Sequence, residues 1–178
     1  MKLSEEGKDN MEKRKIYLSG PERLRKDGKA LFEEKKKLCE AYGFAVLDLP
    51  EEVYQVKDSL ENNRKIAEQR LALIRECDIL IADTGDFRSY VEPFGESALE
   101  LGMGYAYEKE MYCYMPDARV CSERYSGEKK FDEENKSWKD KYGIGFEPGP
   151  LNLMLEYSST VVEGDLEDVL KKITGGAA

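Results

Sequence analysis

Acidic side chains concentrate near the middle of the sequence: Asp83 and Asp86 come first, and Glu92, Glu96 and Glu100 follow. Glu96 and Glu100 are four residues apart in a segment with helical spacing of its apolar residues, which places both on one helix face. Carboxylates that crowd together repel one another, so at least one is expected to keep its proton near neutral pH. A neutral acid beside an ionised one is the pairing that cleaves glycosidic bonds. One carboxylate attacks the anomeric carbon and the other group helps the leaving group depart.

Glu100 is the candidate nucleophile among these acids. Its neighbours Ala98, Leu99 and Leu101 are apolar, and no Lys or Arg lies three or four positions away to pair with it on a helix. A surface glutamate more often has such a partner. The alternative interpretation is a partly buried structural glutamate.

The same crowding of carboxylates also suits a divalent cation. Three aromatic residues, Phe87, Tyr90 and Phe94, alternate with the acids, and flat rings suit a nucleobase better than a hydrated ion. A metal site therefore ranks second, and we expect neither a metal nor another cofactor.

The composition limits the chemistry further. The chain of 178 residues contains no histidine, which excludes Ser-His and Cys-His nucleophiles and histidine metal ligands, so acid–base work must come from carboxylates, Tyr, Lys or Cys. The four cysteines show no paired spacing, so neither disulfides nor a zinc site is expected. The net charge of -9 argues against binding to nucleic acid or to an anionic membrane.

No apolar run approaches the roughly 20 residues that a membrane span needs. The charged N-terminus is unlike a signal peptide, so we expect a cytoplasmic protein. The chain length favours a single α/β catalytic domain over residues 15–174, preceded by a mobile tail at 1–14. The polar segment 117–146 lacks periodicity and carries isolated aromatic residues, which indicates an insertion that acts as a lid or a subunit contact.

Short apolar segments alternate with amphipathic ones along this domain. The pattern predicts strands at 15–19, 44–49, 77–82, 111–115 and 160–162, and helices at 27–42, 59–76, 95–107, after Pro150, and at 166–173. This order specifies a flavodoxin-like three-layer sandwich with a five-stranded parallel sheet. Ligands of such sheets bind beyond the carboxyl ends of the strands, so the loop 83–93 and the helix after it are expected to form the site. Gly102 and Gly104 each cost about 1 kcal/mol within a helix, which indicates a close approach by another backbone or a ligand.

Four blocks of the sequence resemble the nucleoside 2-deoxyribosyltransferase family. They are KIYLSGP (15–21), CDILIAD (77–83), ESALELGMGYA (96–106) and PLNLML (150–155). They occur in the family's order and span nearly the whole chain outside the tails and the insertion. The resemblance implies an enzyme that transfers the sugar of a nucleoside to a free nucleobase.

The resemblance also implies roles for matched positions. Glu100 matches the nucleophile that forms a covalent glycosyl-enzyme, and Tyr17 matches the tyrosine whose hydroxyl contacts it. Asp78 matches an aspartate near the base, although its place at the start of a strand would by itself suggest a solvent-facing carboxylate. Asn152 matches an asparagine that reaches the sugar 5′-hydroxyl in a neighbouring subunit's site, which implies a homo-oligomer with shared sites.

One position departs from the family's pattern. Six residues before the nucleophile, where the family usually has an acid, this chain has Phe94. The role of proton donor to the leaving base therefore falls by default to Glu92 or Glu96. Further substrate contacts are expected from residues at the strand ends and in the helix after Pro150: Ser19, Gly20, Pro21, Asp83, Phe87, Arg88, Gly95 and Met154.

Two alternative functions remain open. The first is a hydrolase that cleaves the N-glycosidic bond of a nucleoside 5′-monophosphate, with Ser19, Gly20 and the basic residues Arg23, Arg25 and Lys26 as phosphate donors. These cations could instead be solvated. The second is a non-catalytic module that binds a nucleotide on the same sheet.

Overall fold

A five-stranded parallel sheet forms the centre of the computed structural model, which describes residues 12–54, 60–88 and 91–176. Its strands are β1 (Lys15–Ser19), β2 (Ala45–Val46), β3 (Ile79–Asp83), β4 (Glu110–Met115) and β7 (Thr160–Glu163), in the order β2-β1-β3-β4-β7. The short apolar segments form strands because both faces of the sheet are covered, and the three central strands β1, β3 and β4 are buried along most of their length. The predicted flavodoxin-like α/β fold is confirmed.

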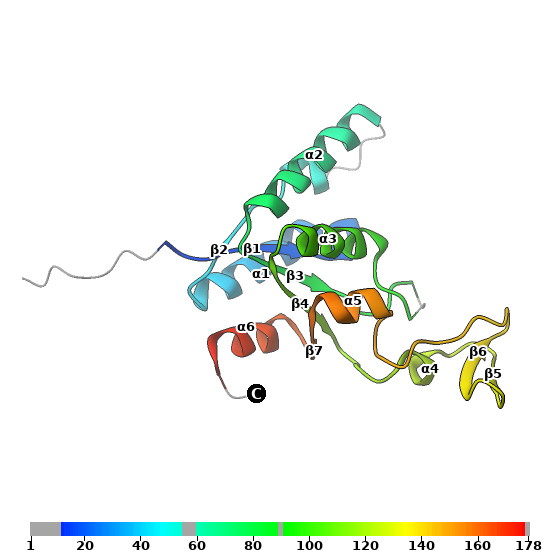
Figure 1. The fold of residues 1–178 in the computed structure, drawn as a ribbon. Helices are drawn as coiled ribbons and strands as arrows, with labels where there is room; N and C mark the ends of the chain where they lie inside the picture. Colours follow the sequence, from blue (N-terminus) through cyan, green and yellow to red (C-terminus); the bar gives the residue numbers. More distant parts are fainter. Residues whose placement is uncertain (1–11, 55–59, 89–90, 177–178) are drawn as a thin grey trace, which may run out of the picture.

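Helices cover the two faces of the sheet. On one face, α1 (Gly28–Ala41) and α6 (Leu166–Thr174) pack on a core that includes Phe32 and Val169. On the other, α2 (Leu60–Glu76), α3 (Gly95–Ala106) and α5 (Leu153–Ser158) surround a core that includes Tyr17, Ile74 and Leu101. Figure 1 shows the N-terminal end of α2 extending beyond the sheet.

Gly104 allows α3 to pack closely on the sheet. A Cβ atom there would lie 2.8 Å from Met111 Sδ and 3.1 Å from Leu80 Cδ1, so any larger residue would push the helix away. The approach predicted at this glycine is therefore made by side chains of β3 and β4. At Gly102 a Cβ would meet nothing within 4 Å, so a close approach does not explain that glycine.

Two segments differ from the sequence prediction. The second strand was expected over 44–49, but β2 holds only two residues, and the chain continues through Pro50 into the short helix η2 (Glu51–Tyr54). Within 117–146, where no element was predicted, the structure has a short helix α4 (Cys121–Arg124) and an antiparallel hairpin of β5 (Lys129–Asp132) and β6 (Ser137–Asp140).

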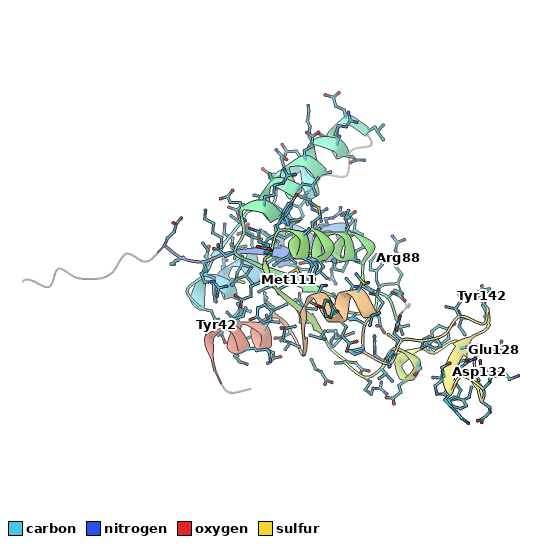
Figure 2. The ribbon with its side chains drawn as sticks, viewed as in Figure 1. Tyr42, Arg88, Met111, Glu128, Asp132 and Tyr142 are labelled. Carbon is cyan, nitrogen blue, oxygen red and sulfur yellow. The ribbon has the colours of Figure 1, made fainter. Side chains whose placement is uncertain are left out.

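The aromatic residues of that segment pair with one another. The Phe131 and Trp138 rings meet edge to face at 5.3 Å across the hairpin, and Tyr125 lies 5.1 Å from Phe146. The hairpin projects from the body of the molecule (Figure 1), and Figure 2 places Tyr142 on it, at the opposite end from Tyr42. Residues 1–11 of the predicted tail lie outside the described part of the chain. No described helix is long and apolar enough to cross a membrane.

Candidate active site

Glu100 lies at the carboxyl edge of the sheet, on the face of α3 that is turned toward β1. Its side chain is buried, with 4% of the residue exposed. Tyr17 and Ser19, which are two apart in β1 and therefore point to the same face, both donate to it. The Tyr17 hydroxyl donates to Glu100 Oε1 over 2.7 Å, and the Ser19 hydroxyl donates to Oε2 and lies 3.0 Å from the hydroxyl of Ser97. Glu100, Tyr17 and Ser19, all three predicted for the site, thus lie in contact.

Arg70 of α2 is a fourth member of this cluster. Its Nη2 donates to Glu100 Oε1, its Nη1 donates to Glu96 Oε2, and its Nε donates to the Tyr17 hydroxyl over 3.2 Å. Burial would lower the pKa of this guanidinium, but the neighbouring Tyr17 and Glu100 outweigh burial and raise it. Burial and the Glu100 charge also raise the pKa of Tyr17 far above its ordinary value, so its hydroxyl remains a donor.

Sequence reasoning missed Arg70. The absence of a local partner suggested an unpaired Glu100, whereas the actual partner comes from a helix 30 residues earlier in the chain. A signal was present, because position 70 lies three residues after Ala67 and four before Ile74, on the apolar stripe of α2. A cation on a buried stripe needs an anionic partner from another element.

Glu96 is in the site, but not as the proton donor predicted for it. Arg23 Nη2 donates to Oε1 and Arg70 Nη1 to Oε2 of this carboxylate. Burial would raise the pKa of Glu96, but the two arginines outweigh burial and hold it below its usual value. An acid that ionises so readily holds no proton near neutral pH, so the role assigned to Glu96 is corrected.

A cavity of about 450 Å³ opens beside this cluster. Such a volume falls within the range of small-molecule sites. Its polar end consists of Arg23, Arg70, Glu96 and Glu100, and its apolar walls come from η1 (Pro21–Leu24), η2, α2 and α3. The apolar lining includes Leu24, Val53, Ile66, Ala67, Leu71 and Leu99.

A second cavity of about 500 Å³ lies on the other side of η1, and Leu24 lines both. Four predicted binding residues, Pro21, Asp83, Phe87 and Arg88, line this second cavity and not the first. Burial raises the pKa of Asp83. This acid with a raised pKa lines a different cavity from that of Glu100.

Glu22 and Gly20 shape the boundary of this second cavity. Glu22 Oε1 accepts from Lys35 Nζ over 2.6 Å, whereas its buried Oε2 has no hydrogen-bond partner in the described chain. A Cβ atom on Gly20 would lie 2.1 Å from that oxygen and 3.2 Å from Asp83 Cβ. The turn after β1 therefore requires glycine because Glu22 and Asp83 both approach its backbone.

The remaining predictions fare differently. Asp78 is exposed and accepts from the Lys15 amide over 2.7 Å at the amino edge of the sheet, opposite Glu100, so its assignment to the base site is wrong. It precedes β3, whereas the cavities lie beyond the strands' carboxyl ends. Glu92 and Gly95 are exposed and line neither cavity. Tyr90 lies outside the described residues.

Asn152 and Met154 lie on a different surface. The Asn152 side chain caps α5 by accepting from the Leu155 amide over 3.3 Å, and Met154 is 72% exposed. Neither residue lines the Glu100 cavity of its own chain. Their predicted role in a neighbouring subunit's site therefore remains a prediction.

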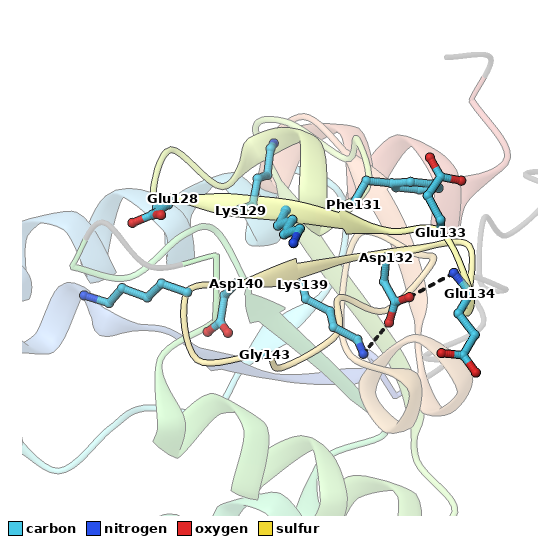
Figure 3. Close-up of a pocket in the computed structure, with 11 residues that line it drawn as sticks. Glu128, Lys129, Phe131, Asp132, Glu133, Glu134, Lys139, Asp140 and Gly143 are labelled. Atoms are coloured by element: carbon cyan, nitrogen blue, oxygen red, sulfur yellow. Dashed lines mark hydrogen bonds and ion pairs between the residues drawn. The ribbon is translucent and has the colours of Figure 1, made fainter.

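The basic run after β1 contributes one cation to the Glu100 cavity. Arg23 lines it, whereas Arg25 pairs with Asp27 over 2.8 Å and Lys26 is exposed. A further hollow of about 640 Å³ lies on the hairpin, where Asp132 pairs with Lys139 over 2.5 Å (Figure 3). Its lining residues all belong to the segment 128–143, and none belongs to the parallel sheet. Across the described ranges, no group of three or more His, Cys, Asp or Glu side chains is placed to hold a metal.

Comparisons with known proteins agree with this architecture. A 2-deoxyribosyltransferase from Leishmania mexicana shares 24% identity, covers 90% of this chain and 97% of its own, and superposes with a TM-score of 0.69. A 2-deoxyribosyltransferase from Bacillus psychrosaccharolyticus shares 21% identity over 88% of this chain and 90% of its own, with a TM-score of 0.53. These two structural similarities support the fold of this chain.

Sequence comparison adds two findings. An uncharacterized protein of Schizosaccharomyces pombe is 28% identical over 160 residues, which is 87% of this chain and 74% of that protein. The family model described as nucleoside 2-deoxyribosyltransferase matches residues 16–154. Because that match spans most of the sequence, from β1 to the start of α5, the chain belongs to the nucleoside 2-deoxyribosyltransferase family.

Proposed function

We propose that the protein cleaves the N-glycosidic bond of a (deoxy)nucleoside with Glu100 as the nucleophile and transfers the sugar to another base. One observation carries this proposal. The Glu100 carboxylate is buried and held by hydroxyls of Tyr17 and Ser19 on the wall of a ligand-sized cavity at the carboxyl edge of the sheet. A carboxylate fixed in this way is placed to attack a bound sugar.

The first step uses the fixed geometry of this carboxylate. As the bond between C1′ and the base breaks, the sugar acquires oxocarbenium character, and the negative charge of Glu100 stabilises it before a bond to C1′ forms. Tyr17 and Ser19 hold the two oxygens, so little reorganisation is needed during the attack. The product of this step is a glycosyl ester of Glu100 and a free base.

A second base then attacks C1′ from the face that the first base left, and Glu100 departs as a carboxylate. Two inversions give overall retention at C1′. Water in place of the second base would give hydrolysis. The second candidate function, hydrolysis of a nucleoside 5′-monophosphate, is favoured by Arg23 in the cavity, whose Nε has no partner among the described residues.

One panel of reactions tests these functions. The purified protein is incubated with deoxynucleosides, ribonucleosides or their 5′-monophosphates, each with and without a second free base, and the products are separated by chromatography. New nucleoside that forms only with the second base supports transfer. Base released from monophosphates alone supports the hydrolase, and ligand binding without any base release would leave only a non-catalytic module.

We also propose a homo-oligomer with shared sites. The surface of α3 and α5 carries several large apolar side chains that are more than half exposed: Leu99, Tyr105, Leu153, Met154 and Tyr157. Exposed apolar patches of this kind mark interaction surfaces, and Asn152, which resembles a residue shared between subunits, begins α5. Light scattering should give a dimer or larger, and Leu153→Glu should yield monomers with reduced activity. A wild-type monomer would contradict this proposal.

A further inference from the structure

The Glu100 cavity contains two guanidinium groups where a proton donor for the leaving base would be expected. Of the carboxyl groups among its described lining residues, Glu100 is the nucleophile, Glu96 is ionised by its arginines, and Glu52 is exposed to solvent. Asp83, the acid with a raised pKa, lines the other cavity. An arginine remains protonated at any working pH, so it can donate hydrogen bonds but cannot act as an acid.

Both arginines have donors to offer. Arg70 uses three contacts, to Glu96, Glu100 and Tyr17, out of the five N–H bonds of a guanidinium. Arg23 Nε is buried without a hydrogen-bond partner in the described chain. A buried donor without an acceptor destabilises the protein, and an acceptor on a bound ligand would remove that cost.

Phe94 holds one of these cations in place. Its ring lies 5.4 Å from the guanidinium carbon of Arg23, within cation–π range. Phe94 stands at the position where the resemblance predicts an acid. In this chain the aromatic ring at that position supports a cation instead of supplying a proton.

The charges of the cluster change when Glu100 reacts. With both glutamates ionised, the charges of Arg23, Arg70, Glu96 and Glu100 cancel. Formation of the glycosyl ester neutralises Glu100, so the other three groups carry one net positive charge in a partly buried site. That charge favours a leaving group that departs as an anion.

We infer that this site releases the base as an anion stabilised by Arg23 and Arg70, and that its substrates are nucleosides of oxo bases, whose carbonyl oxygens take up the charge. This inference rests on the proposed function. The bond between Glu100 and C1′ forms while the bond from C1′ to the ring nitrogen breaks, and that bond's electron pair passes to the base. The arginines donate to the carbonyl oxygens, and the released base takes its proton from water.

Matched substrates test the inference. We expect 2′-deoxyinosine to react faster than 2′-deoxyadenosine, and 2′-deoxyuridine faster than 2′-deoxycytidine, each by about tenfold or more in kcat/KM. In each pair the amino group replaces a carbonyl oxygen, purine O6 or pyrimidine O4, that would accept from an arginine. Arg23→Gln should reduce these ratios, and Arg23→Lys, which keeps the charge, should retain more of them. Arg64→Gln, an exposed arginine on α2, should behave as the wild type.

A leaving-group comparison separates this role from a structural one. The loss caused by Arg23→Gln should be smaller for 5-fluoro-2′-deoxyuridine than for 2′-deoxyuridine, because the fluorinated base is a more stable anion. Equal losses on both substrates, or equal rates for oxo and amino partners with the wild type, would overturn the inference while leaving glycosyl transfer intact. No turnover of any nucleoside or nucleotide would instead overturn the proposed function.

Discussion

The two cavities beside η1 hold their carboxyl groups in opposite ways. In the first, both oxygens of Glu100 and both oxygens of Glu96 accept from hydroxyl or guanidinium donors. In the second, burial raises the pKa of Asp83, and Glu22 Oε2 is buried without a partner among the described residues. Donors hold both oxygens of Glu100 and of Glu96, whereas Asp83 accepts from the Gly85 amide and burial outweighs that bond.

This difference in hydrogen bonding distinguishes the active site better than the position of the two carboxyl groups in the fold does. Both Glu100 and Asp83 lie near the carboxyl edge of the sheet, so the rule that ligands bind there does not separate them. A nucleophile must be oriented toward its target, and the hydrogen bonds from Tyr17 and Ser19 fix both oxygens of Glu100. The comparison therefore predicts unequal consequences when each acid is removed.

Replacing Glu100 should have the largest effect. Glu100→Ala removes the nucleophile, and we expect kcat/KM to fall by about 10³-fold or more, measured as base release. Because this change also leaves Arg70 without one partner, Glu100→Gln, which keeps an acceptor oxygen, serves as the second variant, and circular dichroism checks that both fold. Glu40→Ala, on the exposed face of α1, is the control. Near-normal turnover by Glu100→Gln together with inactivity of Asp83→Asn would reverse the roles of the two cavities.

Removing the Tyr17 hydroxyl should have an intermediate effect. Tyr17→Phe deletes the donor to Glu100 and leaves Arg70 Nε without its acceptor. We expect a fall of about ten- to a hundredfold in kcat/KM and a loss of about 1–3 kcal/mol in the free energy of unfolding, measured by kinetics and by denaturant titration. Tyr42→Phe is the matched control, because it breaks a 2.9 Å bond to Glu167 on the other face of the sheet. Equal activity losses in both variants would show that Tyr17 acts only through stability.

The fold was predictable because it depends on local patterns. Apolar runs and helical stripes located the five strands and the long helices, since burial on both faces of a sheet imposes those patterns. The hairpin of β5 and β6 was missed, because its strands are mostly polar and are stabilised by a few pairs such as Phe131 with Trp138. Such pairs become visible only when the chain has folded back on itself.

The site was predictable only where its residues share an element or a known motif. Local spacing indicated that Glu96 and Glu100 share one face of α3, whereas the contact between Tyr17 and Glu100 was implied by the resemblance. The pairing of Arg70 with Glu100 joins α2 to α3 across 30 residues, and the spacing of residues within one element cannot predict such a contact. The error at Asp78 came from the resemblance, since its place at the start of a strand had already indicated a solvent-facing carboxylate.

Neutralising Asp83 should have the smallest effect, and the effect should depend on pH. Burial raises the Asp83 pKa above 3.8, and the Gly85 amide and Lys35 only partly oppose this. The folded protein therefore binds this proton more tightly than the unfolded chain. The resulting stability is complete below the unfolded pKa and is lost as pH rises through the folded pKa. Asp83→Asn stays neutral and keeps an oxygen for the Gly85 amide. The difference between its Tm and that of the wild type should therefore increase between about pH 4 and pH 7, by roughly 2–4 °C for each kcal/mol of unfolding free energy that the wild type loses.

Asp117→Asn supplies the control for this measurement. The hydrogen bonds from Arg119 hold the pKa of Asp117 at about 2, so its contribution to stability is already complete above the unfolded value of 3.8. The Tm difference of Asp117→Asn should therefore stay constant between about pH 4.5 and pH 7 while that of Asp83→Asn grows. Parallel curves for the two variants would mean that Asp83 is ionised as readily as a paired surface acid. The contrast between the two cavities would then rest on the hydrogen bonds of Glu100 alone.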